Sequence, residues 1–241
     1  YTSSQASKFL GIPDPEGTRF IVAWPENLVN FHQVNPNQET SRGPIVIITG
    51  DEHRKNTLGA LAAAGLETAN DPKRTIVVVG MSGHWVSIHH MSIRAAIREG
   101  ETTTAPRLSE QELLELFQSA SVVLVTSFDE GLSLPVIEAV QSGAPVVASD
   151  IPPHRELLGT GPFMAAPGDI QGLAAAITKT RGSKAIRELQ AARVAAHQHL
   201  TVEQAVHNQL QRFQSLPAGL QSHIHVGGSD PKIALATPWP P

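Results

Sequence analysis

Two carboxylates in the stretch "SFDEGLSLPVIEAV", residues 127–140, have a residue type and a spacing that suit the binding of a ligand. Glu138 lies eight positions after Glu130 and stands inside an apolar helical run, whereas the acids of a surface helix usually occupy a separate polar face. Gly131 and Pro135 mark the start of that helix, because proline is tolerated in a first turn. Ionised carboxylates only accept hydrogen bonds, so this pair suits a ligand that carries hydroxyl groups.

The helix start between the two acids predicts an anion site. A strand, "VVLVTS", leads into the turn "FDEG", and we expect Ser133 to cap the helix with its side chain. The first N–H groups of a helix lack intrahelical partners and lie at its positive end. We expect such groups at four residues: Gly131, Leu132, Ser133 and Leu134. A nucleotide sugar fits this pattern, since its diphosphate lies between two hydroxyl-bearing groups. Alternatively, Glu138 only complements the helix dipole and Glu130 is a solvated turn acid.

A second candidate cluster is "GDEHRKN", residues 50–56, which follows another strand and opens another helix. Lys55 can reach a phosphate as a compact positive charge, and Arg54 can assist it. A solvated helix start is the ordinary alternative for such a basic pair.

Other motifs indicate little chemistry. The stretch "VVVGMSGH", residues 77–84, has G-x-x-G instead of the dinucleotide fingerprint G-x-G-x-x-G, so we interpret it as a loop lining the base end of a cleft. The adjacent His89 and His90 point to different helix faces, and we expect no metal site and no cofactor. The hydrolase elbow G-x-S-x-G is absent from the sequence.

Composition sets the class of protein. The 241 residues are 41% hydrophobic and 17% charged, which predicts a globular chain with a sizeable core. The net charge of −4 and the scattered basic residues argue against a nucleic-acid partner. The sequence shows no apolar run near the length of about 20 residues that spans a bilayer, no secretory signal and no cysteine. We therefore expect a cytoplasmic protein, and leave peripheral membrane association open.

The elements that position these residues alternate between strand and helix. We expect strands at 19–24, 45–50, 75–80, 121–127 and 144–149, with a weaker one at 162–166. We expect helices at 55–69, 87–98, 109–119, 133–142, 170–180 and 183–213. Near-continuous apolar strands are typical of a parallel sheet covered on both faces. The pattern predicts an α/β fold with a doubly wound, mostly parallel, six-stranded Rossmann-like sheet, and ligands at the carboxyl ends of its strands.

The stretch "FDEGLSLPVIEAVQSGAPVVASD" resembles the signature of family 4 retaining glycosyltransferases of the GT-B fold. The resemblance implies that Glu130 contacts hydroxyls of the donor sugar and that Glu138 holds the ribose. It also implies that the amides of 131–134 meet the diphosphate, and that Lys55 contacts it as well. The family often has an aromatic and a glycine where Leu132 and Ser133 stand here. The family's second phosphate-binding arginine is not visible.

The resemblance also covers the ends of the chain. We expect residues 1–215 to be the C-terminal, donor-binding domain, 216–230 a linker, and 231–241 the first strand of a following glycosyltransferase domain. The chain would then be a piece of a polypeptide with tandem glycosyltransferase domains. It would be inactive alone, because acceptor recognition belongs to the missing N-terminal domain.

The implied function is metal-independent sugar transfer from a nucleoside-diphosphate donor to a saccharide or glycoconjugate acceptor, in polysaccharide biosynthesis. Glu130 and Lys55 would be its catalytic residues. Two other classes stay open from the residues themselves. One is a non-catalytic α/β binding or assembly module that keeps the fold. The other, a nicotinamide-dependent oxidoreductase, is disfavoured by the missing glycine fingerprint.

Overall fold

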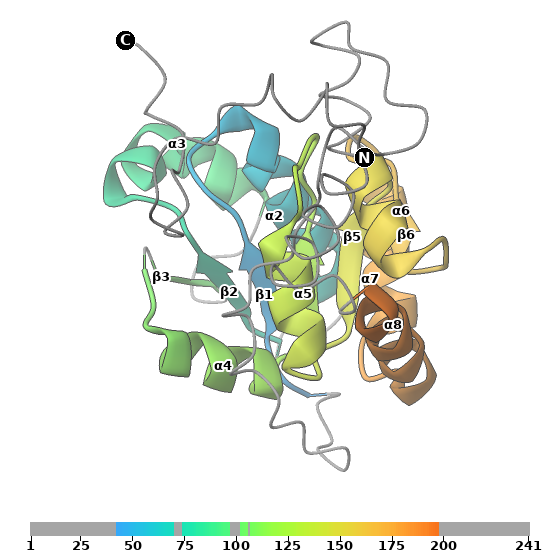
Figure 1. Cartoon of the computed structure of the whole chain (residues 1–241). Coiled ribbons are helices and arrows are strands. Elements are labelled where there is room, and N and C mark those ends of the chain that lie inside the picture. Colours follow the sequence, from blue (N-terminus) through green and yellow to red (C-terminus); the bar gives the residue numbers. More distant parts are fainter. Residues whose placement is uncertain (1–41, 70–73, 97–101, 106, 198–241) are drawn as a thin grey trace, which may run out of the picture.

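The computed structural model describes residues 42–69, 74–96, 102–105 and 107–197. These residues form a six-stranded sheet in the order β3-β2-β1-β4-β5-β6, and every neighbouring pair is parallel (Figure 1). The strands are β1 Ile45–Ile48, β2 Ile76–Val79, β3 Thr102–Ala105, β4 Val122–Val125, β5 Val146–Ser149 and β6 Met164–Ala165. The predicted α/β fold with a doubly wound, Rossmann-like sheet is confirmed.

The strand order reverses between β1 and β4. The chain adds β2 and β3 on one side of β1, then returns to place β4, β5 and β6 on the other. The loops that follow β1 and β4 therefore leave the sheet side by side, and the N–H of Phe128 donates to the carbonyl of Arg54 at 2.7 Å. In open α/β sheets this reversal opens a crevice at the carboxyl ends of the strands, where ligands bind.

Helices cover both faces of the sheet (Figure 1). They are the short 3₁₀ helix η2 His53–Lys55, α2 Thr57–Thr68, α3 Gly83–Ala96, α4 Glu110–Ser119, α5 Leu134–Gln141, α6 Pro152–Leu158, α7 Ile170–Thr180 and α8 Lys184–His197. Alternate strand residues point to opposite faces. Ile45 and Ile47 pack with residues of α2 and α7, while Val46 packs with residues of α5 and α8. These two apolar layers fix the sheet that carries the loops of the site.

The structure differs from the sequence-based expectation at two elements. Strand β3 was not predicted, because "TTTA" is polar and an edge strand does not need apolar side chains on both faces. Helix α6 was not predicted either, since its sequence opens with two prolines; both lie in the first turn, where a missing N–H costs little. The expected strand at 19–24, the linker at 216–230, the strand at 231–241 and the helical stretch beyond His197 lie outside the described residues.

A buried carboxylate joins α2 to α7 at the amino edge of the sheet. Glu67 accepts a hydrogen bond from the hydroxyl of Thr178 at 2.7 Å. Its other oxygen lies 2.9 Å from Nη1 of Arg181, an ion pair that lacks hydrogen-bond geometry, and 3.5 Å from Nη1 of Arg74. Both helices begin at the opposite, carboxyl edge, so this cluster stabilises the frame without touching the candidate site.

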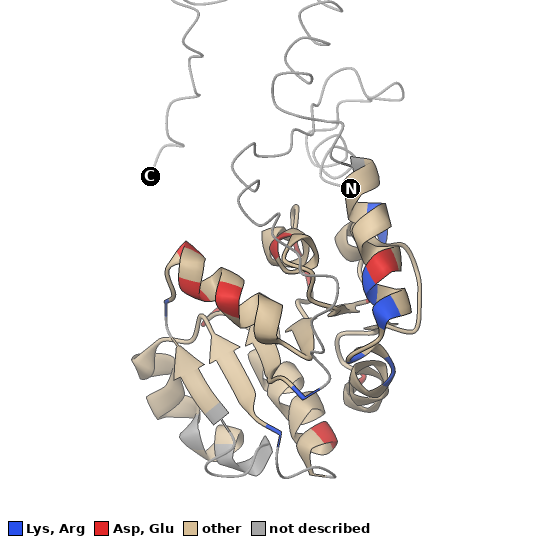
Figure 2. Ribbon diagram, turned by 90° about the horizontal axis from the view of Figure 1, so that it is seen from below, with Lys and Arg blue, Asp and Glu red and all other residues tan. Residues whose placement is uncertain are grey.

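Charge is unevenly distributed over the helices. In the ribbon of Figure 2 acidic positions colour part of α4 red, whereas several positions of α8 have the blue of Lys and Arg. The acids of α4 are Glu110, Glu112 and Glu115, and Glu112 closes a capping box with Ser109 as predicted. Among the described helices none is long and apolar enough to cross a membrane.

Candidate functional site

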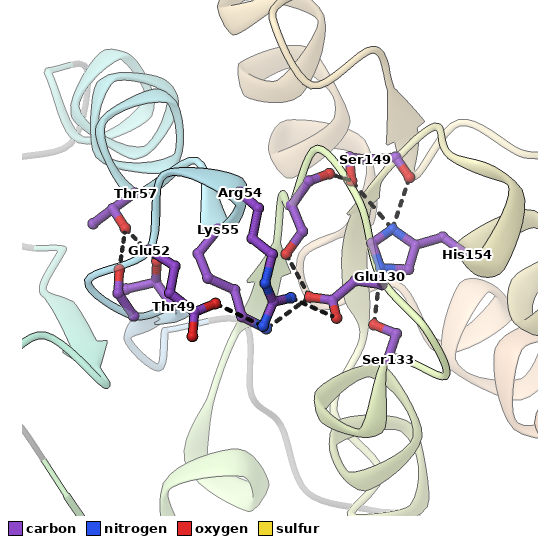
Figure 3. Close-up of polar contacts among 11 residues, drawn as sticks. Thr49, Glu52, Arg54, Lys55, Thr57, Glu130, Ser133, Ser149 and His154 are labelled. Atoms are coloured by element: carbon purple, nitrogen blue, oxygen red, sulfur yellow. Dashed lines mark hydrogen bonds and ion pairs between the residues drawn. The ribbon is translucent and has the colours of Figure 1, made fainter. Parts of the chain in front are cut away.

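The side chain of Glu130 is the centre of the site. It lies in the loop after β4, is only 7% exposed, and accepts a hydrogen bond from Nζ of Lys55 at 2.7 Å. Arg54 donates to the other oxygen, Oε2, at 3.3 Å (Figure 3). The hydroxyl of Ser127 donates to Oε1, the same oxygen that Lys55 binds, at 2.7 Å. The structure thus brings Glu130 together with Lys55 and Arg54, which lie 75 and 76 positions before it in the sequence.

The ionisation state of Glu130 follows from these contacts. Burial alone would raise the pKa of this carboxyl, but the hydrogen bonds from Lys55 and Ser127 and the charges of Lys55 and Arg54 outweigh it, so the pKa lies below its ordinary value. Glu130 is therefore ionised at neutral pH and compensates the charge of Lys55. Since an ammonium group carries three donors, Lys55 can keep this contact and still bind an anion.

Asn56 connects three loops at the carboxyl edge of the sheet through hydrogen bonds of its side chain. Its backbone is left-handed, with φ 53°, a conformation that asparagine tolerates better than most residues. Its side-chain amide donates to the carbonyl of Thr126 at 3.0 Å and to that of Pro167 at 2.7 Å. The loops after β1, β4 and β6 are thereby held together. Sequence reasoning missed Asn56, although an asparagine directly before a helix is a signal for such a turn.

The start of α5 is not capped in the way the sequence predicted. The side chain of Ser133 makes no capping hydrogen bond, so that prediction is wrong. The backbone of Ser133 is left-handed, with φ 57° and ψ 58°, and its hydroxyl instead lies 2.9 Å from Nε2 of His154. Within the described part of the chain, the N–H groups of Leu132, Ser133 and Leu134 have no hydrogen-bond partner, and Pro135 contributes no N–H.

The surroundings of the four-residue turn 131–134 differ from residue to residue. Gly131 is exposed, and a Cβ added there would meet nothing within 4 Å. Leu132 packs against the core on the α5 side of the sheet, whereas Leu134 is 38% exposed. The turn therefore presents backbone and one apolar side chain at the carboxyl edge, beside Glu130.

Glu138 lies one turn inside α5 and is half-buried. Burial raises the pKa of its carboxyl, and the nearby charge of Glu110 on α4 raises it further. No described residue donates a hydrogen bond to it or pairs with it, and it does not contact Glu130. A half-buried acceptor without a partner is costly to the fold, which argues that its position serves something other than stability.

A buried histidine that sequence reasoning missed connects α6 to this site. His154 is fully buried, and its Nδ1 lies 2.8 Å from the carbonyl of Ser149. The Ser149 hydroxyl in turn donates to the carbonyl of Ser127 at 2.5 Å. Burial lowers the pKa of His154, so the ring is neutral at physiological pH. Nothing in "SDIPPHREL" indicates this role, because Ser133, the partner of Nε2, lies 21 positions away in another segment.

The loop after β2 packs closely on the end of β1. Gly80 has φ 106°, and a Cβ there would lie 2.2 Å from the carbonyl oxygen of Thr49. Asp51 accepts the N–H of Ser82 at 2.8 Å. That this loop receives a base stays a prediction. Among the residues that the structure describes, no group of three or more His, Cys, Asp or Glu side chains is placed to hold a metal ion.

Sequence comparison assigns the chain to a family. Residues 32–195 of the 241 match the family model of Glycosyl transferases group 1. The chain belongs to this family. The matched range runs from before β1 into α8, so every element of the site lies within the glycosyl transferase match.

Individual glycosyl transferases resemble this chain over part of their length. O-antigen chain mannosyltransferase B of Escherichia coli is 29% identical over 143 residues, which are 59% of this chain and 38% of that protein. O-antigen chain mannosyltransferase RfbU of Salmonella typhimurium is 32% identical over 108 residues, 45% of this chain and 30% of that protein. The chain thus spans less than half the length of these two relatives.

Among solved structures, a mutant of S. aureus TarM in complex with fondaparinux, α-GlcNAc-glycerol and UDP has a TM-score of 0.65 and 18% identity. The similarity covers 88% of this glycosyl transferase chain and 42% of that one. At this identity the likeness shows a shared fold.

Proposed function

We propose that this chain is the C-terminal, donor-binding domain of a family 4 retaining glycosyltransferase of the GT-B fold. The observation that carries the proposal is the cluster of Lys55, Arg54 and Glu130 at the strand-order reversal, beside the unpartnered N–H groups of α5. Membership of Glycosyl transferases group 1 supports it. The UDP bound by the TarM mutant of the same fold supports a nucleotide as ligand.

Each group of the proposed donor has a chemically matched partner. The diphosphate is bound by Nζ of Lys55 and by the N–H groups of 132–134, at the positive end of α5. These donors are fixed before the reaction and stabilise the negative charge that develops on the departing phosphate. Arg54 lies on the exposed side of Glu130, pairs with Glu52 as well at 2.6 Å, and can assist Lys55.

The two glutamates bind the groups on either side of the diphosphate. Glu138 accepts hydrogen bonds from ribose hydroxyls, which supplies the partners that its half-buried carboxylate lacks. Glu130 accepts hydrogen bonds from hydroxyls of the transferred sugar and orients it, while Lys55 keeps it ionised. We expect no step to need a metal ion, since Lys55, Arg54 and the N–H groups of 132–134 supply the hydrogen-bond donors for the diphosphate.

The relatives suggest the acceptor class. Two similar proteins are O-antigen chain mannosyltransferases, which supports a saccharide acceptor and a place in polysaccharide biosynthesis. Because the chain spans 38% and 30% of those proteins, we assign acceptor binding to a part of the enzyme beyond the described fold.

Calorimetric titration of the whole chain with ADP, CDP, GDP, TDP, UDP and NAD tests the proposal. We expect at least one nucleoside diphosphate to bind and NAD not to. Lys55→Met should weaken that binding about 10-fold or more, because a charged hydrogen bond is lost. Lys179→Met removes an exposed charge from α7, far from the site, and should leave affinity unchanged.

The non-catalytic alternative makes the opposite prediction. A folded chain that binds none of these nucleotides, or whose affinity falls equally with Lys55→Met and Lys179→Met, contradicts a donor site at Lys55. Circular dichroism on each variant separates loss of binding from loss of folding.

A further inference from the structure

Ser133 holds a backbone conformation that its own residue type disfavours. Its φ of 57° and ψ of 58° lie in the left-handed region, which glycine enters freely and other residues enter at a cost. Asn56 is the other non-glycine residue with positive φ in the described part of the chain, and its amide is anchored to Thr126 and Pro167. Ser133 therefore needs an anchor of its own.

His154 is that anchor. Because Nδ1 lies 2.8 Å from the carbonyl oxygen of Ser149, it must carry the proton and donate. In the neutral ring Nε2 is then an acceptor, so the Ser133 hydroxyl donates to it across 2.9 Å. The ring is fully buried and fixed from its other side, and Figure 3 shows it between Ser149 and Ser133.

The anchor has a consequence for the anion site. The left-handed backbone of Ser133 sets the direction in which the neighbouring N–H groups of 132–134 point. Because His154 holds the Ser133 hydroxyl on the buried side, that direction is fixed before a ligand binds. The same network reaches the sugar side, since Ser149 donates to the carbonyl of Ser127, whose hydroxyl donates to Glu130.

We propose that His154 is a positioning residue for the donor diphosphate: through the Ser133 hydroxyl it holds the left-handed backbone of Ser133, which orients the N–H groups of 132–134. This inference rests on the proposed function. His154 itself touches no ligand. Glycine at position 133 would adopt the same turn without an anchor, so the dependence of nucleotide binding on His154 should disappear in a Ser133→Gly background.

The test is the affinity of the tightest-binding nucleoside diphosphate, by calorimetry, across a set of variants. His154→Ala should weaken binding about 10-fold, because without the anchor the free-energy cost of the left-handed conformation of Ser133 is subtracted from the binding free energy. In the Ser133→Gly background the same His154→Ala change should cost less than about 2-fold. Ser133→Ala removes the hydrogen bond to His154 but still has to adopt the left-handed conformation at a cost. It should therefore bind about 10-fold more weakly than Ser133→Gly, for which that conformation costs little.

Gln190→Ala is the matched control. Gln190 is also fully buried and also bonds to β5, through both the N–H and the carbonyl of Val146, but it lies away from the site. This variant should lower the melting temperature and leave the affinity per folded molecule unchanged. If His154→Ala does not fold, the comparison of wild type with Ser133→Ala still decides, because both have a non-glycine residue in the left-handed conformation and only the wild type has the hydrogen bond to His154. Wild type should bind about 10-fold more tightly, and equal affinities would overturn the positioning role.

The outcomes separate this inference from the proposed function. If no nucleoside diphosphate binds the folded wild-type chain, the proposed function fails and the positioning role fails with it. If the wild type binds but His154→Ala costs the same in both Ser133 backgrounds, only the positioning role is overturned. Equal affinities of Ser133→Ala and Ser133→Gly overturn it as well.

Discussion

Some residues of this site lower the stability of the fold and are placed to bind a ligand. Glu138 is the clearest case, because its carboxylate is half-buried without a described partner and faces the charge of Glu110. Glu130 shows the complementary arrangement, in which Lys55, Arg54 and Ser127 satisfy a buried acid before any ligand arrives. The two acids of one motif therefore differ in their surroundings: Glu130 has partners in the unliganded chain, whereas Glu138 has none among the described residues.

Glu138→Gln should stabilise the fold and weaken nucleotide binding. The pKa of Glu138 is raised in the folded state, so ionisation costs stability as pH rises from its ordinary value near 4.5 through the folded-state pKa, and the cost is constant above that. The variant should therefore melt higher than wild type at pH 7, with the difference shrinking below pH 4.5. Nucleotide affinity should fall about 10-fold or more, since a charged acceptor is lost. Melting curves across pH and calorimetry at pH 7 check both parts.

Glu110→Gln is the control for that prediction. It removes the neighbouring charge that raises the pKa of Glu138 while leaving the Glu138 carboxylate in place. It should stabilise the fold without the loss of affinity. A Glu138→Gln variant that melts lower than wild type and binds nucleotide equally well would show that Glu138 is a structural residue.

At the scale of elements, α2 and α7 connect the two edges of the sheet, of which the carboxyl edge carries the candidate site and the amino edge carries the stabilising Glu67 cluster. Their first turns lie at the carboxyl edge, where Asn56 joins the neighbouring loops. Their last turns meet at the amino edge through Glu67. Stability and binding should therefore respond to different substitutions.

Glu67→Ala should destabilise the chain by about 3 kcal/mol, because it removes the buried carboxylate that pairs with the buried Arg74 and the partly buried Arg181. Nucleotide affinity per folded molecule should stay at the wild-type value, since no described contact links Glu67 to the loops of the site. Urea unfolding measures the first quantity and calorimetry the second. A loss of affinity in the folded variant would contradict the separation of the two edges.

Elements with a strong local pattern could be predicted from sequence, and the others could not. β1, β2, β4 and β5 are apolar on both faces and were predicted within a few residues, whereas the polar edge strand β3 has no such pattern. At the site, Glu130, Lys55 and Arg54 were predicted and lie together. The Ser133–His154 contact spans 21 positions and has no local signature, so the prediction of a capping serine failed.

For the whole molecule, the order of the strands decides where the site lies. Only the reversal between β1 and β4 brings the basic pair after one strand beside the acid after the other. The fold alone does not name a substrate, because similar sheets serve many functions. The specific claim is that a diphosphate binds at the start of α5, against backbone N–H groups and Lys55.

Amide chemical shifts measured by NMR during a nucleotide titration of the whole chain test that claim most directly. With EDTA present, addition of the tightest-binding nucleoside diphosphate should shift the amide resonances of Leu132, Ser133 and Leu134 most, while those of Thr178 and Arg181 at the amino edge stay in place. Shifts confined to other elements, or shifts that appear only when a divalent metal is added, would contradict the account.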